Sequence, residues 1–459
     1  MNLYRAISMT PLWILLFVIG SCESFTEIDT PQTELIGTTV FEDVATADAA
    51  LADIYARMRE GGIASGTSLG CGSLMANYAD DMDFYGSNTL TEQFNKHTLL
   101  TTNTTLLSLW NTSYAQLYAI NALIEGVTAS GTLTQPDKDR LIGEGLFLRG
   151  FIYFYLNNLF GDIPYITGTD YRVNATVSKM PSNQVGQFII DDLLAAENLL
   201  PDDYPSAERI RVNKAVCQAL LARVYLYQEN YDQAIVYANL LIDNPAYTIE
   251  PNPELVFLKD SPSIIWAFHP GAEGLNTKDA SAYNFSSGPP TKPALSANLY
   301  NAFEPGDLRK TLWIKIVTNS NGTWYRPYKY KQVASTSPSQ EYTILLRIEE
   351  QYLIRAEAKA MGGDFEAAKE DINAIRTRAG LQGTSAQEQS ELLAAILQER
   401  RLEFFTEQSH RWFDLKRTGN AASVLAPLKP QWQDRDVLLP IPENELLLNE
   451  NLLPQNNGY

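Results

Sequence analysis

The last sixty residues constrain this chain most, because they combine a helical apolar stripe with arginines at matching positions. The apolar residues that recur at helical spacing are Leu393, Leu397 and Phe404. Arg400 and Arg411 fall on the same line, so their guanidinium groups are expected to be buried. Glu403 and Glu407 stand three and four residues from these arginines. Because a buried guanidinium requires carboxylate partners, we predict a structural network of ion pairs here and not a catalytic acid pair.

The final segment, residues 438–459, cannot be helical throughout. Pro440 and Pro442 hold the Pro-Ile-Pro segment in an extended conformation. The sequence then ends with Gln-Asn-Asn-Gly-Tyr. An irregular end of this kind is expected to be tied down by packing.

Both stretches resemble the corresponding parts of the SusD/RagB family. The family runs ER-x-x-E, HRWFDL-x-R and PIP-x-x-E…QN-x-GY are all present, and residues 143–164 (GEGLFLRGFIYFYLNNLFGDIP) match a further run that ends in aromatic-Gly-Asp-x-Pro. One departure is Ser409, where the family often has glycine before HRWFDL. That position affects a turn and not a site.

Members of this family are surface lipoproteins of Bacteroidetes that capture nutrients for an outer-membrane transporter. The resemblance covers nearly the whole mature chain, so it implies a binding protein and not an enzyme. Its expected partners are a SusC-like TonB-dependent transporter and a glycan or other nutrient. The resemblance also implies a division into an N-terminal helical region, residues 22–245, and a C-terminal region, residues 246–459.

Residues 1–21 have the features of a signal peptide: one positive charge at Arg5, the apolar run PLWILLFVIG and small residues before Cys22. The run is too short to span a bilayer. Its end resembles a lipobox, in which the cysteine is acylated; ordinary signal-peptidase cleavage is the alternative. Each buried CH₂ of an acyl chain adds about 0.8 kcal/mol of anchoring. We therefore expect a lipid anchor at Cys22 on the outer membrane, and the acidic residues that follow resemble signals for export to the cell exterior.

The formal net charge of −19 and the sequence pI of about 4.7 argue against nucleic acid and anionic membrane surfaces as partners. Contact with the membrane is therefore expected through the N-terminal lipid alone. Of the two remaining cysteines, Cys71 lies in a Gly-rich loop and Cys217 in an apolar helix pattern. Free thiols are expected, with a disulfide as the alternative.

Helical periodicity predicts a mainly α fold. The first helix ends at Gly61, and a long polar loop is expected from there to about residue 104. A second helix contains Trp110, and a third runs from a capping-box start at Thr134 to Phe160. Further helices fit residues 184–200, 213–227, 232–242, 349–361 and 366–378.

Two pairs of these helices repeat at an offset of 134 residues. Ala222, Tyr231 and Ala234 of the first pair correspond to Ala356, Phe365 and Ala368 of the second. Small and aromatic residues across a short turn are typical of tetratricopeptide hairpins. Because one hairpin cannot bury its own apolar face, we expect about four stacked hairpins. Between the repeats, residues 245–345 are rich in Pro, Gly, Ser and Asn, with a strand-like run at residues 264–268. This insertion is expected to form the binding face.

Catalytic and metal motifs are weak. The Gly66–Gly70 run (GTSLG) matches the nucleophile-elbow pattern, but a helix precedes it and more loop follows, so it is interpreted as a loop. Asp81, Asp83 and Glu92 nearly reproduce the calcium-loop spacing, although Tyr85 occupies a ligand position, and calcium is kept as an alternative. No zinc spacing or phosphate loop is present, and no cofactor is expected.

Sugars present flat C–H faces that stack on aromatic rings and hydroxyls that need amide and carboxylate partners. Residues 77–85 and 283–290 have that mixture, and by position they resemble the two loops that line the glycan site in characterised family members. Trp324 is added from an expected hairpin. The candidate ligand-binding residues are Asn77, Tyr78, Asp80, Asp81, Tyr283, Asn284, Phe285 and Trp324. For each aromatic residue, packing in the core is the alternative.

The sequence therefore predicts a lipid-anchored, helical protein that binds an oligosaccharide or other nutrient without chemistry and delivers it to a transporter. One alternative is an α/α-toroid glycoside hydrolase or lyase, which would need two carboxylates about 5 to 9.5 Å apart across a cleft. Another is a tetratricopeptide adaptor of outer-membrane assembly, although such a protein would not need the insertion or the C-terminal runs.

Overall fold

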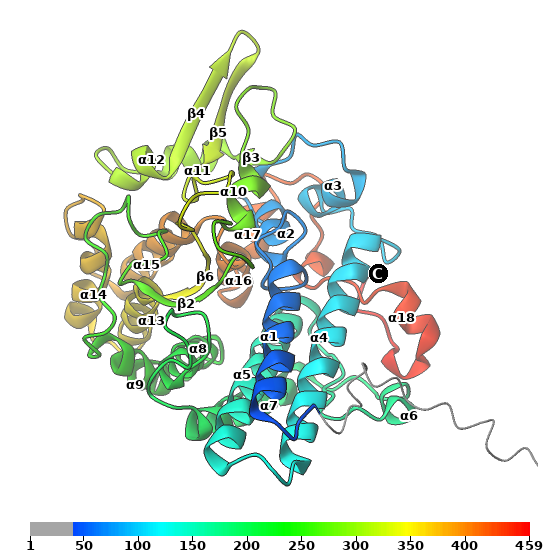
Figure 1. Cartoon of the computed structure of the whole chain (residues 1–459). Helices are drawn as coiled ribbons and strands as arrows, with labels where there is room; N and C mark the ends of the chain where they lie inside the picture. The colour runs from blue at the N-terminus through cyan, green and yellow to red at the C-terminus, as the bar shows by residue number, and fades with distance from the viewer. Residues whose placement is uncertain (1–39) are drawn as a thin grey trace, which may run out of the picture.

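The computed structural model describes residues 40–459 (Figure 1). The expected signal peptide and Cys22 lie outside the described residues. Helices form most of the body, and strands are short. Apart from β1 (Met82–Asp83), the strands all lie between residues 264 and 347. The expectation of a mainly α fold is confirmed.

The helix ends that the sequence marked most clearly are confirmed. In α1 (Val44–Glu60) the carboxylate of Asp43 accepts hydrogen bonds from two backbone N–H groups of the first turn, and the helix ends at Gly61. The hydroxyl of Thr134 accepts a hydrogen bond of 3.4 Å from the N–H of Asp137 and begins α5 (Gln135–Phe160). Beside these lie α4 (Thr104–Ala129), α6 (Tyr171–Asn174) and α7 (Ser182–Leu199).

The expectation of one long loop between Gly61 and residue 104 is wrong, because this stretch contains α2 (Cys71–Tyr78) and α3 (Thr89–Lys96). Each has eight residues, so neither is long enough to establish a helical period in the sequence. All residues of α2 except one are buried, which removes the polar face that identifies an amphipathic helix.

The two repeated pairs are helical hairpins that stack on one another. They are α8 (Lys214–Tyr227) with α9 (Tyr231–Ile242) and α13 (Ile348–Met361) with α14 (Phe365–Arg378), and α9 packs against α13. The alanines that repeat are fully buried: Ala222, Ala234, Ala356 and Ala368. Small residues at these positions let the paired helices approach closely. The assignment of these hairpins to the tetratricopeptide type, and their total number, stay predictions.

The insertion contributes two small antiparallel sheets. One pairs β2 (Ile264–Phe268) with β6 (Thr343–Arg347), and all ten of their residues are buried. The other has the order β1-β3-β5-β4, with β3 (Ala294–Leu295), β4 (Ile314–Asn319) and β5 (Gly322–Pro327). The β4–β5 hairpin projects from the body at the top of Figure 1, and it confirms the hairpin expected around Trp324. Three short helices accompany the strands: α10 (Lys278–Tyr283), α11 (Ala297–Ala302) and α12 (Leu308–Leu312).

The C-terminal part begins with α15 (Gln389–Phe404) and α16 (His410–Arg417), which are separate helices. Ser409, between them, has φ 66° and ψ 13°, the left-handed conformation that favours glycine. This explains why the departure from the family pattern at Ser409 affects a turn. After α16 come α17 (Ala421–Leu425), the 3₁₀ turn η1 (Asp434–Val437), α18 (Glu443–Leu448) and the 3₁₀ turn η2 (Glu450–Leu452).

Arg400 is buried, and Arg411 is partly buried, with 14% of its side chain exposed. Both contact carboxylates, as predicted, but their partners differ from those expected. The Nε of Arg400 donates to Asp414 at 2.7 Å, and the Nε of Arg411 donates to Asp80 at 2.7 Å. The break at Ser409 takes Arg411 off the line of α15, so the helical spacing to Glu407 no longer applies. The partner of Arg411 instead comes from the N-terminal region.

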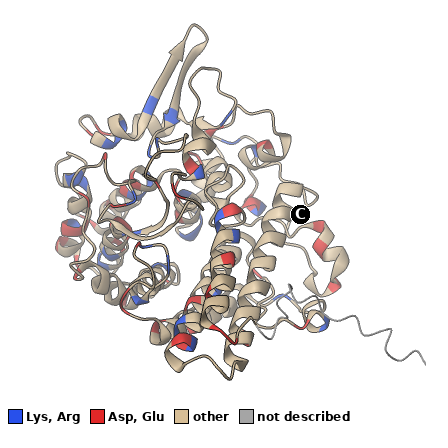
Figure 2. Ribbon diagram, viewed as in Figure 1, with Lys and Arg blue, Asp and Glu red and all other residues tan. Residues whose placement is uncertain are grey.

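Glu403 and Glu407 belong to a second buried network. Arg347 donates to Glu403 at 2.6 Å and to Glu407 at 2.9 Å, and Arg309 donates to Glu403 at 3.0 Å. Lys329 also contacts Glu407 at 2.5 Å. In the view of Figure 2, basic and acidic positions are interspersed along the ribbon. These pairs join the insertion and the end of β6 to α15 and the turn that follows it.

The chain end is tied down by side-chain amides, as expected. Gln455 donates to the carbonyl of Ile441 at 2.7 Å and accepts from its N–H at 2.8 Å, and Asn456 donates to Phe160 O at 2.8 Å.

Cys71 and Cys217 are free, buried thiols. No helix within residues 40–459 has the length and apolarity needed to cross a bilayer.

Candidate functional site

The structure brings together the two loops that the sequence singled out. Strand β1 pairs antiparallel with β3, with Met82 opposite Leu295. Directly beside this pair, the hydroxyl of Ser296 donates to Asp80 O at 2.8 Å, and its N–H donates to Asp81 O at 2.8 Å. Because β3 also pairs with β5, one sheet joins the first loop, the segment that follows the second loop and the projecting hairpin.

Asp80 and Asp81 are buried in a cluster with two arginines and carry the first loop. Asp80 accepts from Arg411 at 2.7 Å and from Arg401 at 2.8 Å, and Asp81 accepts from Arg401 at 3.0 Å. Burial alone would raise the pKa of Asp80, but the hydrogen bond from Arg411 and the charge of Arg401 hold it below its ordinary value. Burial raises the pKa of Asp81. Both carboxylates position the loop and have little surface to offer a ligand.

Asn77, Tyr78 and Tyr283 lie in the core. The Tyr78 hydroxyl donates to Asp436 O at 2.8 Å, and its ring packs edge-on against Trp412 with centroids 4.7 Å apart. The Asn77 amide donates to the carbonyl of Ser73 one helical turn earlier, at 2.8 Å. Tyr283 is buried in a hydrophobic cluster with Met82 and Leu295. Both tyrosine rings are therefore packed in the core, which was the alternative to ligand binding. They have no free face on which a sugar could stack.

Trp324, Phe285 and Asn284 lie together beside the middle of the hairpin, where Trp324 pairs with Val317. Trp324 is 7% exposed and packs with Phe285 and Ala294. Arg326 ties the loop to β5, since its Nη1 donates to the side-chain oxygen of Asn284 and to Phe285 O. Of these three candidates only Asn284 is partly exposed.

Tyr85 is the aromatic residue of the first loop that faces solvent, and the sequence did not single it out. Its side chain is 41% exposed, and it follows β1 by two residues. Partial burial, with the charge of nearby Asp83, raises the pKa of Tyr85 above its ordinary value. Its exposure follows from its place beyond the end of β1, whereas Tyr78 belongs to the buried helix α2.

A pocket of about 340 Å³ opens beside Tyr85, and we call it the Phe84 pocket. Its lining comes from the end of the first loop, from the segments on either side of the second loop and from the segment before α2. It includes Phe84, Asn88, Ser281, Thr291, Lys292 and Ser68. One aromatic ring among hydroxyl, amide and ammonium groups is the mixture that recognition of sugar hydroxyls requires. The Phe84 pocket and Tyr85 together form the candidate glycan site.

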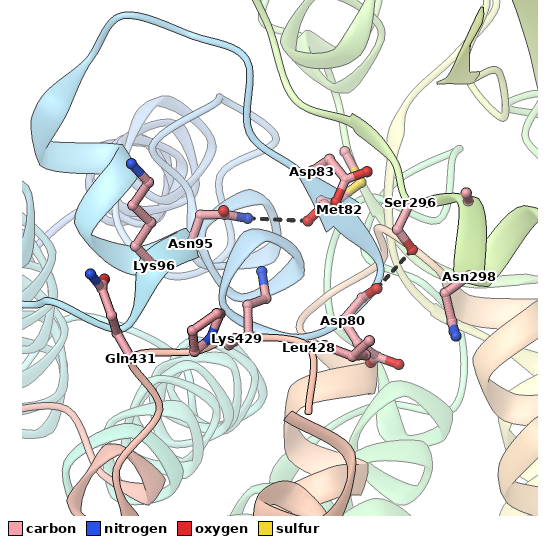
Figure 3. Close-up of a pocket in the computed structure, with 12 residues that line it drawn as sticks. Asp80, Met82, Asp83, Asn95, Lys96, Ser296, Asn298, Leu428, Lys429 and Gln431 are labelled. Carbon is pink, nitrogen blue, oxygen red and sulfur yellow. Dashed lines mark hydrogen bonds between the residues drawn. The ribbon is translucent and has the colours of Figure 1, made fainter. Parts of the chain in front are cut away.

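A second pocket, of about 500 Å³, lies beside β1 and is shown in Figure 3. Asp80, Asp83 and Asn95 line it from the first loop and α3, and Lys429 lines it from the segment after α17. We call it the Lys429 pocket. Burial lowers the pKa of Lys429 to about 8. No sequence motif marks Lys429, because its segment is separated from the loops by most of the chain.

The calcium alternative lacks a convergent set of ligands. Asp81 is held by Arg401, and Glu92 pairs with Lys96 at 2.6 Å. Within residues 40–459 no three side chains of the kinds that ligate metals converge. Ser68 of the GTSLG run is exposed at the rim of the Phe84 pocket.

Two family descriptions match separate parts of this chain. Residues 32–226 match the family described as "Starch-binding associating with outer membrane", and residues 309–459 match the SusD family. The chain is 27% identical to SusD-like protein P2 of Formosa agariphila, over 97% of this chain and 98% of the relative. It is 23% identical to SusD-like protein P25 of the same organism, with the same coverage.

Solved structures share the fold. A SusD superfamily protein from Bacteroides vulgatus superposes with a TM-score of 0.81 at 20% identity, covering 91% of this chain and all of the other. A laminarin-binding SusD-like protein superposes with a TM-score of 0.74 at 24% identity, covering 90% of this chain and 99% of the other.

Proposed function

Because this chain belongs to the SusD/RagB family, we propose that it is a nutrient-binding lipoprotein that captures an oligosaccharide at the outer membrane and delivers it to a SusC-like TonB-dependent transporter. The proposal includes lipid attachment at Cys22 and exposure to the cell exterior. The matched family description names starch, and one structural neighbour binds laminarin. Both support a glucan or a similar glycan as ligand.

The observation that carries the proposal is the pairing of β1 with β3. This pairing joins the segment of Phe84 to a segment about two hundred positions later, and Phe84 lines the pocket together with Ser281 and Thr291. Tyr85 directly follows Phe84 in the chain, which supports including it in the site. A ring that is 41% exposed has a free face for a sugar, and the hydroxyl and amide groups of the pocket can bind the sugar's hydroxyls. In this proposal Asn284 and the middle of the hairpin around Trp324 and Phe285 support that surface.

The proposal does not include catalysis. A glycosidase needs one carboxyl group as acid and a second as base or nucleophile, at a defined separation. Of the two carboxylates that line the Lys429 pocket, Asp80 is neutralised by Arg401 and Arg411. The lining of the Phe84 pocket contains no carboxylate among the described residues. Incubation with candidate polysaccharides should therefore release no new reducing ends, and turnover would contradict binding without chemistry.

The direct test of the site is Tyr85→Ala. Loss of one stacked ring removes about 0.5 to 1.5 kcal/mol beyond area burial, so affinity for the oligosaccharide should fall by about 2- to 12-fold. Isothermal titration with a panel that starts from laminarin and starch oligosaccharides measures this. Tyr171→Ala is the matched control, because Tyr171 is 75% exposed on α6, outside the β1–β3 surface.

The control variant should keep the affinity of the unchanged protein. Equal losses in Tyr85→Ala and Tyr171→Ala, or no loss in either, would show that the glycan does not bind at Tyr85.

A further inference from the structure

The Lys429 pocket is built from three remote parts of the chain. These are β1 with α3, residues 296–298 before and within α11, and residues 428–431 after α17 (Figure 3). Its volume of about 500 Å³ falls within the range of about 300 to 1,000 Å³ that small-molecule sites occupy. None of its lining residues is aromatic, so it lacks the stacking surface on which the candidate glycan site depends.

Most charges in and around this pocket are already paired. Asp80 is held by Arg401 and Arg411, and Lys96 contacts Glu92 at 2.6 Å. These groups therefore contribute little net charge to the pocket.

Asp83 and Lys429 differ from their neighbours. Within residues 40–459 neither makes an ion pair, and the ammonium of Lys429 donates only to Asn77 O, at 3.3 Å. Burial lowers the pKa of Lys429, and the negative charges of Asp83, Asp80 and Asp81 offset that effect only in part. A partly buried ammonium without a bound carboxylate is unfavourable. The pocket thus presents one unpaired anion and one unpaired cation.

Further groups around the pocket have unused hydrogen-bonding capacity. The side-chain oxygen of Asn298 accepts from Arg401 at 2.8 Å, which leaves its amide N–H groups for a ligand. The amide nitrogen of Asn95 donates to Met82 O at 3.1 Å, which leaves its oxygen as an acceptor. Met82, Leu428 and Pro430 add apolar surface to the lining.

We propose that the Lys429 pocket is a second ligand site, which binds a zwitterionic α-amino acid or short peptide. Lys429 and the amide of Asn298 contact the ligand's carboxylate, Asp83 and the oxygen of Asn95 contact its ammonium group, and the apolar lining contacts its side chain. The pocket's two unpaired charges then become paired at once, which neither a neutral sugar nor an ion of one sign achieves.

The test uses the dipeptide Ala-Leu with two blocked forms, N-acetyl-Ala-Leu and Ala-Leu-amide, in calorimetric titrations of the full chain at pH 7. Blocking either end should weaken binding by about 10- to 100-fold, the usual effect of losing one charge-assisted contact. Asp83→Asn and Lys429→Met should each cause a loss of the same size for unmodified Ala-Leu. Asp203→Asn and Lys315→Met, at exposed positions without an ion pair among the described residues, are the controls and should change nothing.

Each variant should also cause no additional loss of affinity for the blocked ligand that already lacks the corresponding charge. Asp83→Asn should cause no further loss with N-acetyl-Ala-Leu, and Lys429→Met should cause none with Ala-Leu-amide, because in each case the contact is already absent. This match keeps the test specific even if a variant lowers stability. Tyr85→Ala should leave Ala-Leu binding within twofold, which separates this proposal from the proposed glycan site.

Three outcomes would overturn the proposal. The first is absence of Ala-Leu binding at millimolar concentration. The second is binding that Asp83→Asn and Lys429→Met leave unchanged. The third is binding of a neutral disaccharide that these two variants abolish, which would make the pocket part of the glycan site.

Discussion

At the scale of single residues, buried arginines hold the loops of the binding surface in place. Arg411 belongs to α16, yet its carboxylate partner Asp80 begins the first loop. Arg401 of α15 contacts both Asp80 and Asp81. The C-terminal helices therefore determine the position of a loop more than three hundred residues earlier, and substitution of these arginines should act on stability first.

Arg411→Ala should lower the free energy of unfolding by about 3 to 5 kcal/mol, the usual cost of removing one partner of a buried ion pair. Chemical denaturation measures this. Arg172→Ala is the control, because Arg172 pairs with Asp170 at 3.0 Å on the exposed surface, where ion pairs contribute little. A folded Arg411→Ala protein of unchanged stability that had lost only its ligand would contradict a structural role.

The same pair predicts a pH dependence. The folded-state pKa of Asp80 is held below its unfolded value, so its contribution to stability is present above the ordinary aspartate range and is lost as the pH falls through the folded pKa. The difference in stability between the unchanged protein and Arg411→Ala should therefore narrow as the pH falls below about 4.

At the scale of secondary-structure elements, the binding surface depends on very short strands. β1 and β3 have two residues each, and β3 meets β5 at a single residue pair, Leu295 with Tyr325. Such pairing is weak alone, so packing around Trp324 in the middle of the hairpin must support it. Gly288 lies directly against the ring of Trp324, where an added Cβ would come within 2.0 Å of the ring atom Cζ3.

Gly288→Ala should therefore displace Trp324 and loosen β5 from the second loop. Overpacking of this kind costs about 1 to 3 kcal/mol, and a lower melting temperature should accompany weaker oligosaccharide binding. Gly131→Ala is the control, because a Cβ there meets no atom within 4 Å. If both variants melt at the temperature of the unchanged protein, the packing of Gly288 against Trp324 does not support the site.

Helices that repeat the helical period over several turns could be predicted from the sequence. The eight-residue helices could not. α5 has a cap at Thr134 and runs for 26 residues, whereas α2 and α3 have eight residues each. The hairpins α8–α9 and α13–α14 were recognisable because their small residues recur.

The candidate site was predictable as a pair of loops but not as a set of side chains. Composition identified the loop that contains both Tyr78 and Tyr85. Which ring is exposed depends on the packing of Tyr78 against Trp412 of α16, far along the chain. Lys429 was not predicted because the sequence around it contains no motif. Its pocket is formed only when segments far apart in the chain come together.

At the scale of the whole molecule, a mainly helical body carries the proposed ligand surface. Aromatic stacking contributes about 0.5 to 1.5 kcal/mol for each ring, so one exposed tyrosine with polar neighbours should give weak capture, about millimolar to micromolar. Weak capture suits a protein that passes its ligand on. In the proposed complex the surface around Tyr85 faces the transporter, which encloses the ligand from the other side.

The most direct test compares the affinity of one oligosaccharide for the lipoprotein alone, for the neighbouring transporter alone and for their purified complex. The account predicts a stable complex that binds the oligosaccharide more tightly than either protein, with Tyr85→Ala reducing that affinity and Tyr171→Ala leaving it unchanged. Failure to form a complex, or a complex that binds no more tightly than the lipoprotein alone, would contradict it.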